Sequence, residues 1–149
     1  MKTIISIALI LSCISIKSQI THNPEEIVKQ IRIEFNKINR IKLDCKMQDL
    51  NDVSTEGGEM KKCYDGQDLR KAIFIFYRET EKLIVEYYFK DKKIIFSNTK
   101  EDRYNAPIYI EGGGKIASTM VSRYYFSEGE LIRWLGKDNK IVDVEMHQS

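Results

Sequence analysis

Two similar stretches, residues 85–96 and 122–134, constrain the fold of this chain more than any other feature. Each holds the triplet Tyr-Tyr-Phe, then four turn residues, then two aliphatic residues. Such spacing is typical of a tight hairpin in which the aromatic residue before the turn pairs with the aliphatic residue after it. The same spacing occurs three times, at Tyr64/Leu69, Phe89/Ile94 and Phe126/Leu131. The sequence therefore predicts an antiparallel meander.

The other strands are predicted from alternating apolar residues and from turn residues. Residues 72–77 form an apolar run that favours a central strand, and Asp65-Gly66 is a strong hairpin signal. We expect strand segments at residues 41–50, 60–64, 69–77, 83–89, 94–98, 115–126 and 131–135, with a last short one at 141–144. Because the outermost segments have a weak pattern, we expect a sheet of about six strands.

One amphipathic helix is predicted over residues 24–39. Asn23 suits the N-cap, and Pro24 suits the first helical position, where a missing N–H is no loss. An apolar stripe with helical spacing follows, made of Ile27, Val28, Ile31, Phe35 and Ile38. This stripe needs a partner, and only the sheet can supply one. The predicted fold class is α+β, with one N-terminal amphipathic helix packed on an antiparallel meander sheet.

The first 18 residues have the layout of a secretory signal peptide. A positive start is followed by an apolar run over residues 4–16 and by the polar residues Lys17-Ser18-Gln19. The run is shorter than the roughly 20 residues of a transmembrane helix. We expect cleavage after Ser18, a single domain over residues 19–149, and a periplasmic or secreted protein that does not insert into the membrane.

Cys13 lies within this leader and offers an alternative. Residues 10–13, Ile-Leu-Ser-Cys, are similar to a bacterial lipobox, in which the cysteine becomes the lipidated first residue. The apolar run continues after Cys13 instead of giving way to a polar tether. Ordinary cleavage is therefore favoured over a lipid anchor, and both remain open.

Charge and cysteine content limit the classes of partner and of chemistry that this chain can have. The chain has 24 Lys and Arg residues, two of them in the leader, and 22 Asp and Glu residues, so the mature chain has a net charge near zero. A nucleic-acid partner is not expected, because it requires a basic surplus. Cys45 and Cys63 remain after cleavage, and an even pair in an oxidising compartment favours a disulfide over a nucleophile or metal ligand. We predict no metal and no cofactor.

Hairpin pairing predicts which side chains share a face of the sheet. The more apolar set is expected under the helix: Tyr87, Phe89, Ile94, Phe96, Tyr124, Phe126, Leu131 and Leu135. The other set is expected on a semi-exposed face: Ile84, Glu86, Tyr88, Ile95, Arg123, Tyr125, Ile132 and Trp134. A bulge in one strand would reverse this assignment.

The second set supplies the candidate ligand-binding residues. Glu86 and Arg123 should lie two strand spacings apart, about 9.6 Å, with rings around them from Tyr88, Tyr125 and Trp134. Rings and arginine are enriched at binding hot spots. The alternative is ordinary cross-strand packing.

A second candidate is the long loop predicted over residues 99–114. Loops of this length are usually functional or disordered. Arg103 and Tyr104 could contact a partner, and Gly112–Gly114 would allow the loop to move. A loop without a contact role is the alternative.

Catalysis is not expected. A nucleophilic triad needs a positioned base, and His22 and His147 lie near the two ends of the chain. A small carboxylate-dependent hydrolase is the alternative from another class, although no acidic pair stands out.

Three short motifs give the chain a family resemblance. They are Thr55-Glu-Gly-Gly-Glu59, the two Tyr-Tyr-Phe triplets and Leu131-Ile-Arg-Trp134. Over about residues 24–135 it resembles a group of small exported bacterial proteins of unknown function, found mostly in Gram-negative gliding and gut bacteria. The resemblance implies a secreted or periplasmic domain and transfers no site. We expect a non-enzymatic module that binds a protein or a small ligand; an envelope structural protein or an immunity protein is a further alternative.

Overall fold

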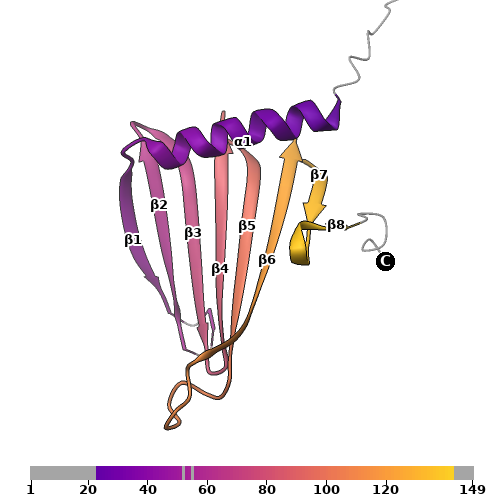
Figure 1. Cartoon of the computed structure of the whole chain (residues 1–149). Helices are drawn as coiled ribbons and strands as arrows, with labels where there is room; N and C mark the ends of the chain where they lie inside the picture. The colour runs from indigo at the N-terminus through magenta and orange to yellow at the C-terminus, as the bar shows by residue number, and fades with distance from the viewer. Residues whose placement is uncertain (1–22, 52, 55, 143–149) are drawn as a thin grey trace, which may run out of the picture.

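The computed structural model describes residues 23–51, 53–54 and 56–142. Helix α1 (Pro24–Arg40) precedes an eight-stranded antiparallel sheet whose strands follow the sequence order (Figure 1). The strands are β1 (Asp44–Leu50), β2 (Gly58–Asp65), β3 (Asp68–Arg78), β4 (Glu81–Lys90), β5 (Lys93–Tyr104), β6 (Ile116–Ser127), β7 (Glu130–Leu135) and β8 (Ile141–Val142), with a short 3-10 turn η1 (Lys137–Asn139) before β8.

The predicted α+β class is confirmed, and the sheet has two strands more than expected. The weakly patterned outer segments, β1 and β8, both join it. Strand β1 is mostly exposed, which explains its polar composition. The predicted leader, Cys13, His22 and His147 lie outside the described residues. Within the described part of the chain, no helix has the length and apolarity needed to cross a membrane.

Helix α1 begins where Asn23 and Pro24 predict and ends at Arg40, one residue beyond the predicted segment. The Asn23 side-chain oxygen accepts a hydrogen bond from the Glu25 N–H at 3.1 Å. Val28, Ile31 and Ile38 are buried. The off-stripe residue Ile33 is 54% exposed. The helix lies across one end of the strands, from the β7 side of the sheet towards β1 (Figure 1).

The three predicted aromatic–aliphatic pairs all form. Tyr64 pairs with Leu69, Phe89 with Ile94 and Phe126 with Leu131. Next to each pair the register shifts by one, so that one extra residue is inserted in the strand after the turn. From the register, the inserted residues are Arg70, Ile95 and Ile132. Each of them reaches α1 or the core beneath it: Arg70 pairs with Glu34 of the helix, and Ile95 and Ile132 pack against the core cluster.

These bulges reverse the predicted covered face. Beyond the Phe89–Ile94 pair, Phe96 stands opposite Tyr88 instead of Tyr87. The face that packs under α1 therefore holds Tyr88 and Tyr125, which are 1% and 4% exposed. Of the set expected there, Phe96 and Leu135 are buried under the helix, whereas Tyr87 and Tyr124 alternate to the other face. The assignment of faces was wrong because the bulges move side chains from one face to the other.

Aromatic rings build the core between helix and sheet. The Phe35 ring lies 4.8 Å from that of Tyr88 and 5.3 Å from that of Phe96, centroid to centroid. The Phe96 ring in turn lies 5.0 Å from that of Tyr125. Ring pairs at these distances add stabilisation beyond the area that they bury. The core is thus one row of rings from β4, β5 and β6, closed by the apolar stripe of the helix from Val28 to Ile38.

Two further predictions concern β1 and the long loop. Cys45 and Cys63 form a disulfide between directly opposed residues of β1 and β2, as predicted. A disulfide is typical of chains in oxidising compartments, which is consistent with export. The predicted loop is shorter than expected, because residues 99–104 belong to β5. The remaining turn is held by backbone hydrogen bonds, and a Cβ at Gly113 would collide with the Pro107 carbonyl oxygen. Gly113 therefore allows the turn to pack closely against the Pro107 carbonyl group, because glycine has no Cβ.

Candidate binding surfaces

The candidate residues from the sequence divide among three places in the structure. Glu86 and Arg123 flank Asn98 on neighbouring strands, as predicted. Tyr88 and Tyr125 lie two residues further along the same two strands, on the same face and closer to the helix. Trp134 pairs with Tyr124 on the opposite face of the sheet. Arg103 and Tyr104 end β5, where the chain enters the turn opposite to the helix (Figure 1).

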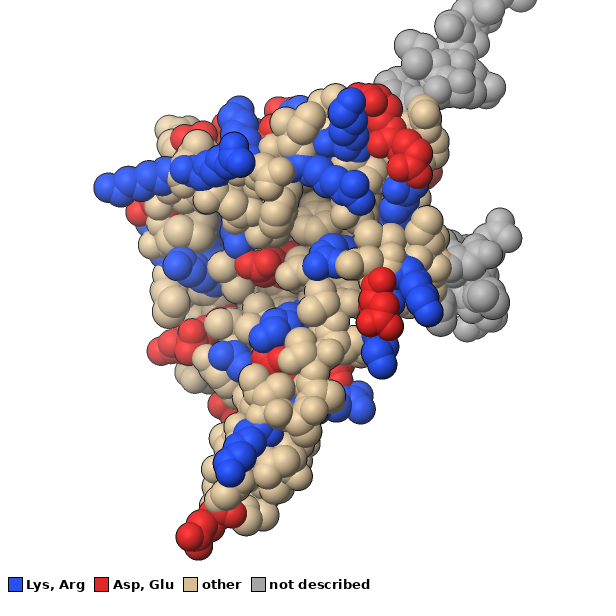
Figure 2. All heavy atoms as spheres, viewed as in Figure 1, with Lys and Arg blue, Asp and Glu red and all other residues tan. Residues whose placement is uncertain are grey.

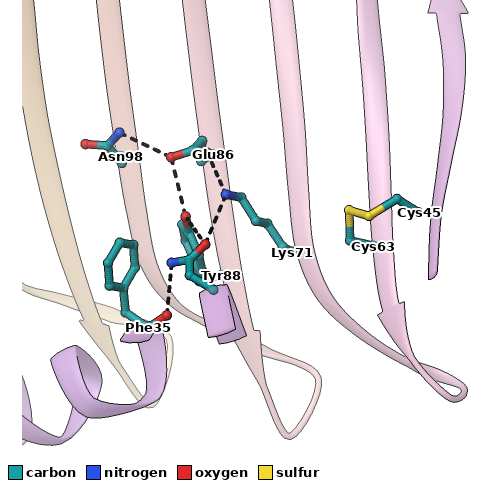
Figure 3. A network of polar contacts seen from close by, with 8 residues as sticks. Phe35, Cys45, Cys63, Lys71, Glu86, Tyr88 and Asn98 are labelled. Carbon is teal, nitrogen blue, oxygen red and sulfur yellow. Dashed lines mark hydrogen bonds and ion pairs between the residues drawn. A yellow bond between two sulfur atoms is a disulfide. The ribbon is translucent and has the colours of Figure 1, made fainter. Parts of the chain in front are cut away.

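Glu86 is the centre of a polar network next to the helix (Figure 3). Its carboxylate lies 2.7 Å from the Lys71 ammonium and 3.3 Å from the Asn98 amide nitrogen. The Tyr88 hydroxyl lies 3.4 Å from both the Glu86 carboxylate and the Asn39 amide oxygen, so it can donate to either one. One carboxylate thus joins β3, β4 and β5, and the contacts of Lys71 and Tyr88 with Asn39 connect the network to the helix.

Burial and hydrogen bonds shift the pKa values in this network. Burial alone would lower the pKa of Lys71, but hydrogen bonds to Glu86 and Tyr88 outweigh it, so the pKa is raised above its usual value. Burial raises the pKa of the Tyr88 hydroxyl. The Lys71 ammonium also lies 4.7 Å from the centre of the Tyr88 ring. The network holds Lys71 charged and Tyr88 neutral, which is the arrangement of a structural ion pair.

Glu86→Gln should lower the free energy of unfolding by about 1–3 kcal/mol, because Lys71 would keep its charge without a carboxylate partner. Urea unfolding at pH 7 measures this loss. The Lys71–Glu86 ion pair makes its full contribution to the free energy of unfolding below the usual lysine pKa. This contribution decreases as the pH rises through the raised pKa of Lys71. The variant should therefore lose less stability than the wild type on passing from pH 10 to pH 11.5. A variant as stable as the wild type at pH 7 would contradict the role of the network.

The face of the sheet opposite to α1, here called the uncovered face, carries a row of half-buried rings. It is made of the outward positions of β3 to β7, which are Ala72, Phe74, Phe76, Arg78, Glu81, Leu83, Val85, Tyr87, Ser97, Thr99, Glu101, Arg103, Ser118, Met120, Ser122, Tyr124 and Trp134. Phe74 contacts Tyr87 at 6.0 Å, and Tyr124 stacks on Trp134 at 5.5 Å, between ring centroids. No other described helix or strand lies on this face.

The uncovered face is apolar and large. From β3 to β7 there are four strand spacings, about 19 Å, and Leu83 to Tyr87 spans about 14 Å along β4. The projected area is on the order of 300 Å², the lower end of the size range of the largest apolar patch on a monomeric protein, and such patches are often functional. The charged side chains of this face, Arg78, Glu81, Glu101 and Arg103, lie together at the end away from the helix, where Arg78 pairs with Glu81 and Arg103 pairs with Glu101 at 2.6 Å.

A second feature lies on the helix side, between α1, β6 and η1, and is here called the arginine hollow. Two adjoining cavities of about 220 Å³ and 520 Å³ share Arg32, Arg123 and Tyr125 in their lining. The Arg32 guanidinium lies 5.8 Å from the centre of the Tyr125 ring. Arg123 donates to the side-chain oxygen of Asn139. Arg32 is a residue that sequence reasoning missed, because it looks like an ordinary solvated position on the polar side of the helix.

The described residues offer no catalytic arrangement that we can assign. Both described cysteines are in the disulfide, and no group of three or more His, Cys, Asp or Glu side chains in the described part of the chain could hold a metal ion. Comparisons with known proteins give no further guide: no family model, no curated protein and no solved structure matches this chain. The function therefore has to be argued from the two surfaces themselves.

Proposed function

We propose that this protein is an exported, non-enzymatic binding module that engages a protein partner through the uncovered face. One observation carries the proposal: the helix packs against one end of a single face of the sheet, while the other face is an aromatic surface on which no described helix or strand lies. An antiparallel sheet with one solvated face normally alternates apolar residues inward and polar residues outward. Here the outward positions of β3, β4, β6 and β7 include rings at Phe74, Tyr87, Tyr124 and Trp134.

The chemistry of the uncovered face favours a protein as the partner. Protein interfaces are enriched in aromatic residues and depleted of charge in their centre, and both hold for this face. A nucleic acid would need a surplus of cations, whereas Arg78 and Arg103 on this face are each paired with a glutamate. The partner should present an apolar, uncharged surface of similar size.

The double variant Tyr124→Ala with Trp134→Ala should weaken partner binding at least about 30-fold while the fold is retained. Each ring is half-buried at the candidate interface, and truncating a central aromatic hot spot costs about 2 kcal/mol or more. The mature protein would be used to capture partners from the envelope fraction. Each captured protein would then be purified and titrated against the wild type and the variant by calorimetry.

Tyr109→Ala is the matched control, because Tyr109 is an aromatic residue 68% exposed in the turn between β5 and β6. It should bind the purified partner as the wild type does. The proposal is wrong if the double variant binds every captured protein as tightly as the wild type. Loss of binding in Tyr109→Ala alone would place the site in the turn and contradict the uncovered face.

A further inference from the structure

We infer that the arginine hollow is a binding site for a small organic anion, with the oxyanion held between Arg32 and Arg123 and the apolar part lying against the core rings. This site is on the helix side of the sheet and is independent of the partner surface proposed above. The inference rests on the charge balance of the hollow, on the shape and chemistry of its lining, and on the way it is built.

The charge of the hollow is positive and only partly compensated. Arg133, which lines the larger cavity, forms a bidentate ion pair with Glu25 of the helix. Within the described part of the chain, Arg123 donates to the neutral Asn139 oxygen, and Arg32 rests over the Tyr125 ring. Glu25 attracts both Arg133 and Arg32, and these two arginines lower the pKa of its carboxyl, with Arg133 having the larger effect. No Asp or Glu of the described chain lines either cavity. Two guanidinium groups therefore face a shared space without a carboxylate in it.

Other described cations on the helix side are compensated differently. Lys71 is paired with Glu86, Arg70 with Glu34, and Lys100 with Asp102. The arginine hollow differs from these three ion pairs and is similar to Lys82, which rests over the Tyr77 ring as Arg32 rests over that of Tyr125. On the surface that Figure 2 shows, which is viewed as in Figure 1, Lys and Arg side chains are interspersed with acidic ones.

The lining of the hollow combines this charge with an apolar floor. Ile31, Phe35, Phe96 and Tyr125 line the smaller cavity, and Arg32 and Arg123 supply its positive side chains. Ligand sites are typically concave, mostly apolar and furnished with a few directed polar groups. Guanidinium groups bind carboxylates and phosphates in a planar, bidentate manner. A volume of about 220 Å³ suits one substituted ring, which would meet only the edges of Phe96 and Tyr125, because both rings are 4% exposed.

The hollow is also built on rigid elements. Arg32 projects from the middle of α1, Arg123 from β6, and the floor is part of the buried core. The contact between Arg123 and Asn139 joins the hollow to η1, which gives the guanidinium a fixed orientation. A site held in this way loses little conformational entropy when an anion binds.

Titration with benzoate and with phenyl phosphate tests the inference. Both anions should bind saturably, with dissociation constants in the millimolar range or tighter, and should shift the NMR signals of the Phe96 and Tyr125 rings. Arg32→Gln and Arg123→Gln should each weaken binding at least about 10-fold, because each removes a charge-assisted hydrogen-bond donor. Raising the salt concentration should weaken the binding of both anions.

Three controls make the result decisive. Arg40→Gln removes the same charge from the exposed last turn of the same helix, outside the hollow, and should leave the affinity unchanged. Benzyl alcohol has the ring without the charge and should bind at least 10-fold more weakly than benzoate. Tyr124→Ala with Trp134→Ala should bind benzoate normally, so that this site and the partner surface are judged separately.

The inference is overturned if neither anion shifts the ring signals, if benzyl alcohol binds as well as benzoate, or if Arg40→Gln is as harmful as Arg32→Gln. Arg32 is exposed on the helix surface, so its replacement is expected to leave the fold intact. A thermal unfolding curve for each variant confirms that a loss of affinity is not a loss of structure.

Discussion

Tyr88→Ala should lower the free energy of unfolding by about 3–5 kcal/mol, the largest effect expected for a single substitution in this protein. Tyr88 is 1% exposed, and its ring contacts those of Phe35 and Phe96. Truncation would leave a cavity between helix and sheet and would remove a hydroxyl from the Glu86 network. Because domains are stable by only about 5–15 kcal/mol, a large share of the stability would be lost. Urea unfolding followed by circular dichroism measures it.

Tyr87→Ala is the matched control, because it removes the same side chain from the adjacent position on the uncovered face. Tyr87 is half-buried, and its loss should cost less than about 2 kcal/mol. If Tyr88→Ala does not fold, Tyr88→Phe and Tyr87→Phe make the same comparison on a smaller scale, with a loss of about 1 kcal/mol expected for Tyr88→Phe alone. A greater loss at position 87 than at position 88 would contradict the faces assigned to these two tyrosines.

Removal of the disulfide by Cys45→Ala with Cys63→Ala should cost about 3 kcal/mol in the chain-entropy model. The two cysteines are separated by 18 positions and join β1 to the rest of the sheet. Strand β1 is an edge strand with mostly exposed side chains, so little other than its pairing with β2 holds it in place. Hydrogen exchange should therefore show the greatest loss of protection in β1, alongside a lower urea midpoint.

A reducing agent provides the control for this prediction. It should lower the stability of the wild type by a similar amount and leave the double alanine variant unchanged. Thiol labelling of the unfolded wild type without reductant should find Cys45 and Cys63 unreactive. Labelling of both residues would show that the disulfide is absent and would contradict the prediction.

Local features of the sequence predicted much of this fold. The Asn23 cap, Pro24 and the apolar stripe placed the helix within one residue of its observed end. The three aromatic–aliphatic pairs were predicted from spacing alone, because two-residue turns fix which residues stand opposite one another. The hairpin turns agree with this: Asp91, Lys92, Glu128 and Gly129 all adopt positive φ, as the twist of tight hairpins requires.

The candidate site was less accessible to sequence reasoning. The placement of Glu86 and Arg123 on either side of Asn98 follows from hairpin pairing and was predicted. Arg32 could not be included, because only the packing of α1 on the sheet brings it next to Arg123 and Tyr125. Trp134 was expected beside Tyr125, and the bulge at Ile132 places it on the opposite face.

The sequence by itself thus determined most of the elements, their order and the residues that pair at each hairpin turn, since these depend on contacts between residues close in the chain. Only the tertiary structure decided which face of the sheet the helix covers. Both faces carry rings, so the apolar pattern did not distinguish them. One residue is inserted after each turn, and its own side chain reaches the helix or the core beneath it. This insertion exchanges the two faces to which the side chains of the following strand point. The second tyrosine of each Tyr-Tyr-Phe triplet therefore belongs to the core, and the first belongs to the uncovered face.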